Sequence, residues 1–169
     1  MELSIIVEVI LMNDNWIDKV LKEQYQFVRV LKRNEKTEIC VFRHKTLGKQ
    51  IIKRTMQSSG EVYSVLKNFS HPNIANIYDV IKTDTGIIVL EEFIDGQTIA
   101  DYLQESLYVP SGVKKIASAL CDALDFLHSH KIIHKDIKPE NVMIDNSGNV
   151  KLIDFDAARV YKNYQSMVT

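Results

Sequence analysis

The stretch "HKDIKPENVMIDNSGNVKLIDF", from His134 to Phe155, decides how the rest of the chain is interpreted. It begins with a polar loop and continues as two short apolar runs, NVMI and VKLIDF, which flank the turn sequence DNSG. Two apolar runs on either side of such a turn predict a β-hairpin. The stretch therefore predicts a loop with several ionisable side chains that leads directly into a hairpin.

The polar side chains of this stretch have the chemistry of a magnesium and phosphate site. Asp136, Lys138 and Asn141 lie in the loop, and Asp154 follows at the end of the second predicted strand. Carboxylate and carboxamide oxygens bind Mg²⁺ together with phosphate oxygens. A lysine between them can neutralise a phosphoryl group during transfer. Lys53, at the end of the apolar run QIIK, could reach phosphates from a second lobe.

Residues 25–92 predict a small antiparallel sheet. Turns that contain Gly48 and Gly86 separate some of its apolar runs. These runs are rich in Val, Ile, Phe and Tyr, and they read YQFVRVL, TEICVFRH, KQIIKR, IANIYDVIK and GIIVLEEF. Residues 58–69 interrupt the runs with apolar side chains at helical spacing, so we expect one helix against the sheet.

The periodicity changes after Gly96. In PSGVKKIASALCDALDFLHSH, residues 110–130, apolar side chains recur at i, i+3, i+4 and i+7, which predicts a long amphipathic helix. The expected fold class is α+β, with an antiparallel sheet lobe followed by a partial helical lobe. We expect an N-terminal extension over residues 1–24, the sheet lobe over 25–95 and the helical lobe over 96–169.

Several of these segments carry a family resemblance. HKDIKPEN resembles the catalytic loop of protein kinases, H-R-D-L-K-P-x-N, and KLIDF resembles the strand that leads into their metal-binding D-F-G motif. IIK is similar to the V-A-I-K strand, and SHPNI to the segment after the helix of the sheet lobe. The resemblance covers residues 25–159 and implies a two-lobe protein-kinase-like fold. A lysine two residues after the loop aspartate is the pattern of Ser/Thr kinases.

The resemblance also implies roles for individual residues. Asp136 would accept the proton of a Ser or Thr hydroxyl on a protein substrate, and Lys138 would stabilise the transferred phosphoryl group. His134 would pack behind the Asp154–Phe155 turn. The residues implied to bind the cofactors ATP and Mg²⁺, the last two as metal ligands, are Lys53, Glu61, Glu92, Ile94, Asn141 and Asp154.

The chain departs from the family pattern at the phosphate-binding loop. The kinase loop is L-G-x-G-x-F-G-x-V, and the matching stretch here is LKRNEKTEI, in which Lys32, Asn34 and Thr37 replace the three glycines. Glycine lets backbone amides approach phosphates closely, so bulkier residues should weaken that contact. Either the basic side chains of this stretch supply charge instead, or only the hairpin is retained.

Other positions depart as well. Asp156 stands where the D-F-G glycine belongs, and Lys135 replaces the usual arginine, which weakens the bidentate docking of a phosphorylated activation loop. Glu61 is the acidic residue of its predicted helix, although counting back from SHPNI places Val62 at the position that pairs with the β-strand lysine. The sequence ends soon after Asp156, before an A-P-E segment, so we expect the platform for a protein substrate to be missing.

Three functions compete on these observations. The first is a Ser/Thr protein kinase domain, seen as a fragment. The second is a pseudokinase that senses nucleotide or binds a partner, which the glycine-free loop and the early end of the sequence favour. The third is a phosphotransferase for small molecules, against which the lysine of KPEN argues.

Composition excludes some partners and locations. The net charge of −1, from 21 basic and 22 acidic residues, provides no broad basic field for nucleic acid. The N-terminal MELSIIVEVILM contains Glu2 and Glu8 and is too short to span a bilayer, so it predicts a buried strand or the start of a helix rather than a signal peptide or membrane span. Cys40 and Cys121 share no metal-binding spacing and are expected to be buried thiols in a reducing, cytoplasmic compartment.

The long helix predicts a possible partner surface. One sheet lobe can cover its apolar stripe from Val113 to Leu127 only in part, so several Leu, Ile and Val side chains should stay exposed. A contiguous apolar patch of this kind marks an interface. We therefore expect self-association through the exposed surface of the helical lobe.

Overall fold

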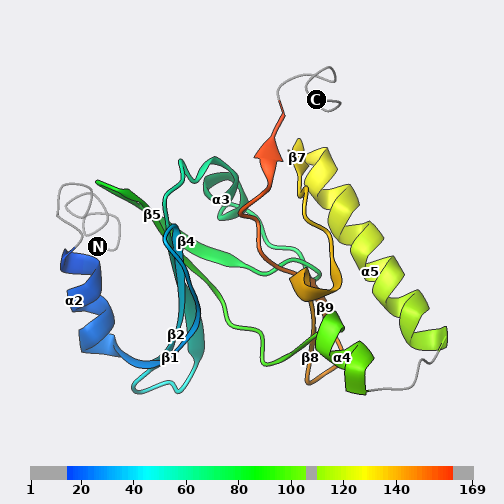
Figure 1. Cartoon of the computed structure of the whole chain (residues 1–169), viewed down its shortest axis with the longest axis horizontal. Coiled ribbons are helices and arrows are strands. Elements are labelled where there is room, and N and C mark those ends of the chain that lie inside the picture. Colours follow the sequence, from blue (N-terminus) through cyan, green and yellow to red (C-terminus); the bar gives the residue numbers. More distant parts are fainter. Residues whose placement is uncertain (1–14, 106–109, 162–169) are drawn as a thin grey trace. The chain divides into compact units, whose positions relative to one another are not determined.

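The computed structural model describes residues 15–105 and 110–161, and its elements fall into two compact units (Figure 1). The first unit comprises Met1–Gly60 with Asp79–Glu91, and the second comprises Glu61–Tyr78 with Glu92–Thr169. In this division the segment 61–78 groups with the later, helical part of the chain.

The first unit is built on a five-stranded sheet with the strand order β1-β2-β3-β5-β4. The pairs β1–β2 and β2–β3 are antiparallel. Each predicted apolar run forms a strand, and the strands are β1 (Tyr25–Arg33), β2 (Thr37–His44), β3 (Gln50–Met56), β4 (Ile77–Thr83) and β5 (Gly86–Glu92). The first residue of β5, Gly86, has to be glycine, because a Cβ at this position would collide with the backbone oxygen of Met56.

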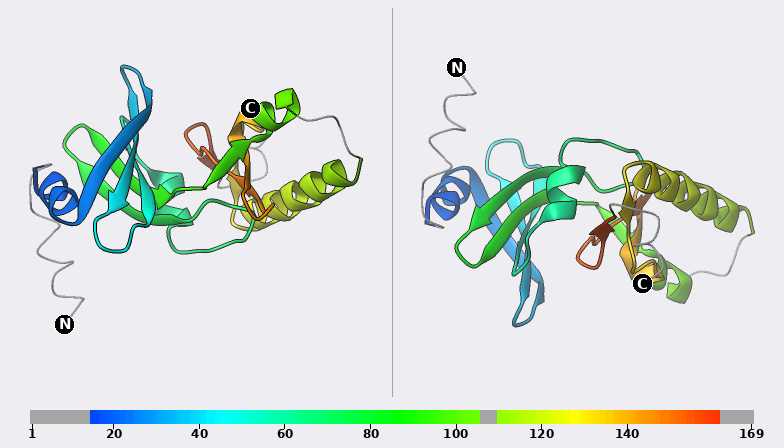
Figure 2. Two further views of the ribbon diagram at one scale, coloured as in Figure 1. Left: turned by 90° about the horizontal axis from the view of Figure 1, so that it is seen from below. Right: turned by 90° about the horizontal axis from the view of Figure 1, so that it is seen from above.

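A helix that was not predicted covers one face of this sheet (Figures 1 and 2). Helix α2 (Asn15–Gln24) buries Ile17 and Leu21 against Ile51 of β3 and Ile88 of β5. Its apolar stripe is only two turns long, which is too short for periodicity alone to reveal. The expectation for residues 1–12 lies outside the described residues.

Helix α3 (Glu61–Leu66) is the helix expected within residues 58–69, but it is shorter than that range. Gly60, at φ +69°, immediately precedes its first turn. Val62, Tyr63 and Leu66 are buried, as the helical spacing of the apolar residues requires. The helix belongs to the second unit.

The second unit holds the hairpin and the long helix that the sequence predicts. Helix α5 (Pro110–Ser129) matches the expected helix and packs on β7 and β9 (Figure 1). The predicted hairpin is present as β8 and β9, and β6 joins it as a third strand, while β7 pairs with β10. The remaining elements are β6 (Gly96–Thr98), α4 (Ile99–Glu105), β7 (Ile132–Ile133), η2 (Pro139–Asn141), β8 (Val142–Asp145), β9 (Val150–Leu152) and β10 (Arg159–Val160).

The apolar stripe of α5 is covered better than expected. Ala119, Ala123 and Leu127 are buried, and the larger side chains beside them are half-buried: Val113, Ile116, Leu120 and Leu124. The expectation that several Leu, Ile and Val side chains of this helix stay exposed is therefore wrong for the described part of α5.

Two simple expectations about the surface have different outcomes. Cys40 is buried, as predicted, but Cys121 is exposed on α5, so the prediction of a buried thiol there is wrong. Across residues 15–105 and 110–161, no helix combines the length and the apolar character needed to cross a membrane.

Candidate active site

His134 anchors the polar loop to the strand that precedes Asp154. Its side chain is 1% exposed. Its Nδ1 accepts a hydrogen bond from the backbone N–H of Asp136 at 3.3 Å, while Nε2 donates to the carbonyl oxygen of Ile153 at 3.1 Å. This pairing requires the neutral ring, and burial lowers the pKa of His134. The histidine thus fixes the backbone on both sides of the site.

Asp136 is held by two partners from its own loop. The Lys138 Nζ lies 2.8 Å from its Oδ2, and the Asn141 Nδ2 donates to the same oxygen at 2.9 Å. The hydrogen bond from Lys138 is the main cause that lowers the pKa of the Asp136 carboxyl group, and the bond from Asn141 adds to it. Asp136 is therefore a carboxylate at neutral pH, with one oxygen fixed in place.

Asn141 is buried and connects the loop to the second hairpin strand. Its Nδ2 also donates to the backbone oxygen of Asp136 at 2.9 Å, and its own carbonyl accepts from the N–H of Ile153 at 2.9 Å. Because both amide hydrogens go to Asp136, the Oδ1 atom is left as an acceptor. A carboxamide oxygen beside the strand that ends at Asp154 fits the donor set that Mg²⁺ prefers.

Asp154 has a backbone conformation unusual for a non-glycine residue, with φ +63°. Its Oδ1 accepts from the N–H of Asp156 at 3.3 Å. In the described part of the chain no three His, Cys, Asp or Glu side chains gather as a metal cluster. The candidate magnesium site therefore consists of one carboxylate and one carboxamide, and a bound phosphate would have to supply the further oxygens.

The segment after Asp154 is packed against His134 and against Tyr63 of α3. Phe155 is 1% exposed, with its ring 5.0 Å from that of His134 and 6.3 Å from that of Tyr63. The Tyr63 hydroxyl donates to the Asp156 Oδ1 at 2.6 Å. Asp156, which replaces a glycine of the family motif, is thus tied to α3. No sequence signal indicated Tyr63 as its partner.

The turn between β1 and β2 is closed by its own side chain. The Oδ1 of Asn34 accepts from the backbone N–H groups of Lys36 and Thr37, each at 2.9 Å. Arg33 and Glu38 form an ion pair across the turn. Side-chain to backbone bonds of this kind replace the conformational role of glycine in a tight turn. Two amides that could otherwise approach a phosphate are already bonded to Asn34.

On β3, Lys53 and its neighbour have different surroundings. Lys53 is half-buried and lies opposite Cys40 on β2. Arg54 is buried, and its Nε donates to the Glu91 Oε1 at 3.0 Å. The IIK motif indicates Lys53, whereas no motif in the sequence indicates that Arg54 pairs with Glu91.

The other residues expected to contact the nucleotide are Glu61, Glu92 and Ile94. Glu61 is exposed in the first turn of α3. The Glu92 Oε2 accepts from the backbone and side-chain nitrogens of Asn76, each at 3.0 Å, and from Lys151 Nζ at 2.8 Å. Ile94 is buried. The Glu92 side chain is therefore engaged within the second unit, and so is its backbone N–H, which donates to the Asn76 carbonyl oxygen at 2.9 Å.

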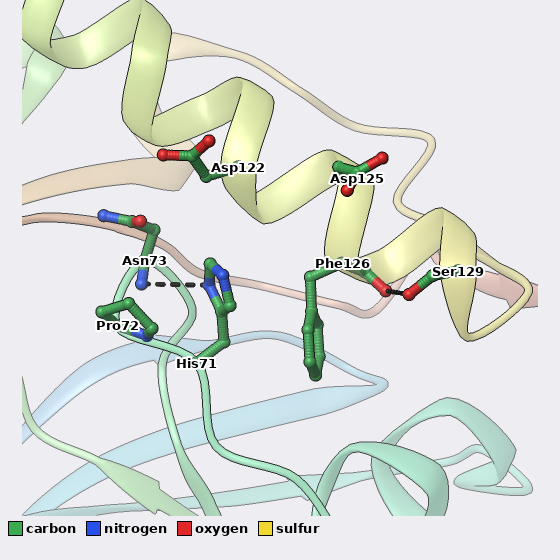
Figure 3. Close-up of a pocket in the computed structure, with 7 residues that line it drawn as sticks. All are labelled: His71, Pro72, Asn73, Asp122, Asp125, Phe126 and Ser129. Carbon is green, nitrogen blue, oxygen red and sulfur yellow. Dashed lines mark hydrogen bonds between the residues drawn. The ribbon is translucent and has the colours of Figure 1, made fainter.

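A separate hollow of about 370 Å³ lies beside α5 and contains none of the candidate residues (Figure 3). Its lining consists of His71, Pro72, Asn73, Asp122, Asp125, Phe126 and Ser129. The loop part is fixed by the N–H of Asn73, which donates to the His71 Nδ1 at 3.2 Å. The hollow is not the phosphate site that the sequence predicts.

The grouped residues can orient a hydroxyl group and hold a metal–phosphate complex. A carboxylate with one fixed oxygen can accept a proton. The adjacent ammonium group of Lys138 can compensate charge on a phosphoryl group, and Asn141 and Asp154 can present oxygens to a cation. This combination defines the class of phosphoryl-transfer proteins.

Comparisons with known proteins agree with this class. The family model described as "Protein kinase domain" matches residues 25–169, so the chain belongs to the protein kinase domain family. The chain is 35% identical over 104 residues to CBL-interacting serine/threonine-protein kinase 21 of Arabidopsis thaliana, covering 62% of this chain and 25% of that protein. It is 28% identical over 156 residues to the probable serine/threonine-protein kinase PknB of Lactococcus lactis, covering 85% of this chain and 25% of that protein.

A third relative is also a protein kinase. The SNF1-like protein kinase ssp2 of Schizosaccharomyces pombe is 35% identical over 121 residues, which is 69% of this chain and 20% of that protein. The matches thus span about a quarter or less of the length of these relatives. The resemblance to a Ser/Thr kinase domain is confirmed, and the chain corresponds to part of such a protein.

Lowering the pH should destabilise the fold through His134. Its pKa in the folded chain lies below the ordinary value of 6.5. Between these two pKa values the unfolded chain binds a proton that the folded chain does not, so the free energy of unfolding falls as the pH drops below 6.5 and is unaffected by this residue above it. Thermal melts recorded from about pH 7.5 to 5 should show this decrease.

Two variants separate this effect from general acid sensitivity. His134→Gln should show a shallower decrease than the unmodified chain, whereas His128→Gln, at an exposed position of α5, should match the unmodified chain. Equal slopes for His134→Gln and the unmodified chain would show that His134 does not cause the pH dependence.

Proposed function

We propose that the protein containing this chain is a Ser/Thr protein kinase that transfers the γ-phosphate of ATP to protein hydroxyl groups. The observation that carries this proposal is the Asp136 carboxylate held 2.8 Å from the Lys138 ammonium group and 2.9 Å from the Asn141 amide. Family membership and the names of the relatives support it. Lys138, two residues after Asp136, also follows the pattern of Ser/Thr kinases.

In this proposal the two loop residues have separate tasks. Asp136 accepts the proton of the substrate hydroxyl as the hydroxyl attacks the γ-phosphorus, and the bond to the leaving ADP oxygen breaks. Lys138 compensates the charge of the phosphoryl group in transit. The contacts with Lys138 and Asn141 are made by the Asp136 Oδ2, so the other carboxylate oxygen is the one proposed to take the hydroxyl proton.

Magnesium is the cation that fits the proposed site. Asn141 Oδ1 and the Asp154 carboxylate would hold it, and when bound it would shield the negative charge of the phosphates. The residues proposed to bind the nucleotide elsewhere are Glu61, Glu92 and Ile94. For Glu92 the proposed contact is through the backbone carbonyl oxygen, because the side chain is bonded to Asn76 and Lys151 and the backbone N–H to Asn76.

The proposal extends to the organisation and location of the protein. We propose that residues 25–95 and 96–169 act as the two lobes, with 1–24 as an extension, and that the protein works in the cytoplasm. The free cysteines Cys40 and Cys121 are compatible with a reducing compartment. Fractionation of the native cell would test the location, and recovery with secreted material would contradict it.

We also propose that the chain self-associates through the side of α5 that carries half-buried apolar residues. Leu120 and Leu124 lie on this part of the helix and keep some contact with solvent. Sedimentation velocity should show a dimer that grows with concentration. Leu124→Glu should shift the distribution toward monomer, because a charge in an apolar contact is unfavourable. A monomer at every concentration would contradict the proposal.

The activity is tested by phosphoamino acid analysis. The native protein that contains this chain is incubated with ATP labelled at the γ-phosphate, Mg²⁺ and a mixture of basic protein substrates, and the labelled amino acids are separated after hydrolysis. The proposal predicts phosphoserine or phosphothreonine without phosphotyrosine. Label only in phosphotyrosine, or none from a folded sample, would contradict it.

A further inference from the structure

The two basic residues of β3 lie on opposite faces of the sheet. Successive side chains of a strand point to opposite faces. In the pairing of β2 with β3, Lys53 lies opposite Cys40, whereas Arg54 lies opposite Ile39. Only one of these cations can therefore face a ligand that binds to one side of the sheet.

The face of Lys53 is the face that α2 covers. Ile51, two residues before Lys53 on the same strand, packs with Ile17 and Leu21 of α2. Leu90 of β5 packs against the same cluster. α2 therefore occupies part of the face on which Lys53 lies, and a nucleotide bound on this face would have to share it with the helix.

The face of Arg54 carries a buried ion pair. Arg54 and Glu91 have side chains that are 5% and 7% exposed, and their closest N–O distance is 3.0 Å. Burying two charges costs desolvation energy that an ion pair rarely recovers in full, and apolar residues of similar size often stabilise a fold better. A contribution to fold stability is therefore a weak reason for this ion pair. A binding function of the Arg54 guanidinium group is a better one.

Arginine suits the task of binding phosphate. Its planar guanidinium group can donate two parallel hydrogen bonds to a phosphate, and it stays charged when buried. The turn between β1 and β2 has fewer backbone N–H groups to offer a phosphate, because the amides of Lys36 and Thr37 are bonded to the Asn34 side chain. More of the attraction for phosphate must then come from a side chain.

From these observations we infer that Arg54, and not Lys53, is the β3 cation that binds the phosphates of the nucleotide, and that a phosphate takes the place of the Glu91 carboxylate on it. The inference rests on the proposed function for its ligand, ATP. In the chain without nucleotide, Glu91 neutralises the buried guanidinium group. On binding, the carboxylate and the phosphate compete for the same donors, so Glu91 sets the affinity.

Four variants of the full chain test this inference, each measured by calorimetry with ATP and with adenosine in the presence of Mg²⁺. Arg54→Met with Glu91→Met removes the cation without leaving a buried unpaired charge. Lys53→Met tests the rival cation, and Lys49→Met, at the turn before β3, is the matched control. Glu91→Gln keeps the size of the side chain but removes its charge. Circular dichroism and a cooperative melt establish that each variant is folded.

The expected results differ among the variants. The double variant should bind ATP about tenfold or more weakly, while its affinity for adenosine stays within about twofold. Lys53→Met and Lys49→Met should retain both affinities, and Glu91→Gln should bind ATP several-fold more tightly. A weaker affinity for adenosine in the double variant, as a merely structural role predicts, would overturn the inference.

The same data separate this inference from the proposed function. If the unmodified chain binds ATP and Lys53→Met loses that binding while the folded double variant keeps it, Arg54 is not the phosphate-binding cation, but the proposed function stands. If the folded unmodified chain binds neither ATP nor adenosine, both the inference and the proposed function are wrong.

Discussion

Asp136→Asn should lower the rate of phosphoryl transfer by about 10²–10⁴-fold, because a positioned general base contributes about that much. The affinity for ATP should change by no more than about twofold, since Asp136 is proposed to orient the hydroxyl and not to hold the nucleotide. The amide cannot accept the hydroxyl proton, and it also loses the charge that holds Lys138 at 2.8 Å. Initial rates with saturating ATP, together with calorimetry, measure the two quantities.

A matched carboxylate on the surface controls for the substitution itself. Asp125→Asn, at an exposed position of α5, should leave both the rate and the affinity unchanged. Equal losses of rate and affinity in Asp136→Asn would show that Asp136 helps to bind the nucleotide, and that its proposed role is wrong.

Leu127→Ala should destabilise the fold by about 2–5 kcal/mol, the range measured for buried leucines that leave a cavity. Leu127 is 0% exposed, and its helix α5 packs on β7 and β9. Interiors are close-packed, so little around the missing side chain can collapse to fill the space. Urea unfolding followed by circular dichroism measures the free energy of unfolding.

The same substitution at an exposed position provides the control. Leu103 of α4 is 45% exposed, and Leu103→Ala should change the free energy of unfolding by less than about 0.5 kcal/mol. A cost for Leu127→Ala as small as that for Leu103→Ala would mean that α5 does not pack as described.

Much of the fold could be predicted because its main signals are local. The strands of the five-stranded sheet are short apolar runs between turns, and α5 is long enough for its period to be clear. The hairpin of β8 and β9 follows from one turn sequence. The grouping of Asp136, Lys138 and Asn141 was also accessible, because these residues lie within one short loop, and their hydrogen bonds confirm that they lie together.

The features of the site that could not be predicted depend on contacts between residues far apart in the sequence. Which of Lys53 and Arg54 faces a ligand is decided by the register of β2 with β3, and a shift of one residue reverses the answer. A motif match to IIK cannot detect that difference. The partnership of Arg54 with Glu91, 37 residues away, and that of Tyr63 with Asp156, 93 residues away, have no local signal either.

The turn between β1 and β2 shows why the loss of the family's glycines is hard to interpret from sequence. Without its glycines, the stretch around Asn34 could have lost the hairpin or kept it by other means. The Asn34 Oδ1 accepts hydrogen bonds from the amides of Lys36 and Thr37, so the hairpin is kept while these two amides are already bonded within the turn. The residue type alone does not distinguish these outcomes.

The most direct test of the account is whether nucleotide binding depends on magnesium through Asp154. Calorimetry on the 169-residue chain is carried out with ATP, with and without Mg²⁺, for the unmodified protein and for Asp154→Asn. We predict that Mg²⁺ strengthens ATP binding to the unmodified chain, and that this gain disappears in Asp154→Asn. ATP binding that is indifferent to Mg²⁺, or a gain that persists in a folded Asp154→Asn variant, would contradict it.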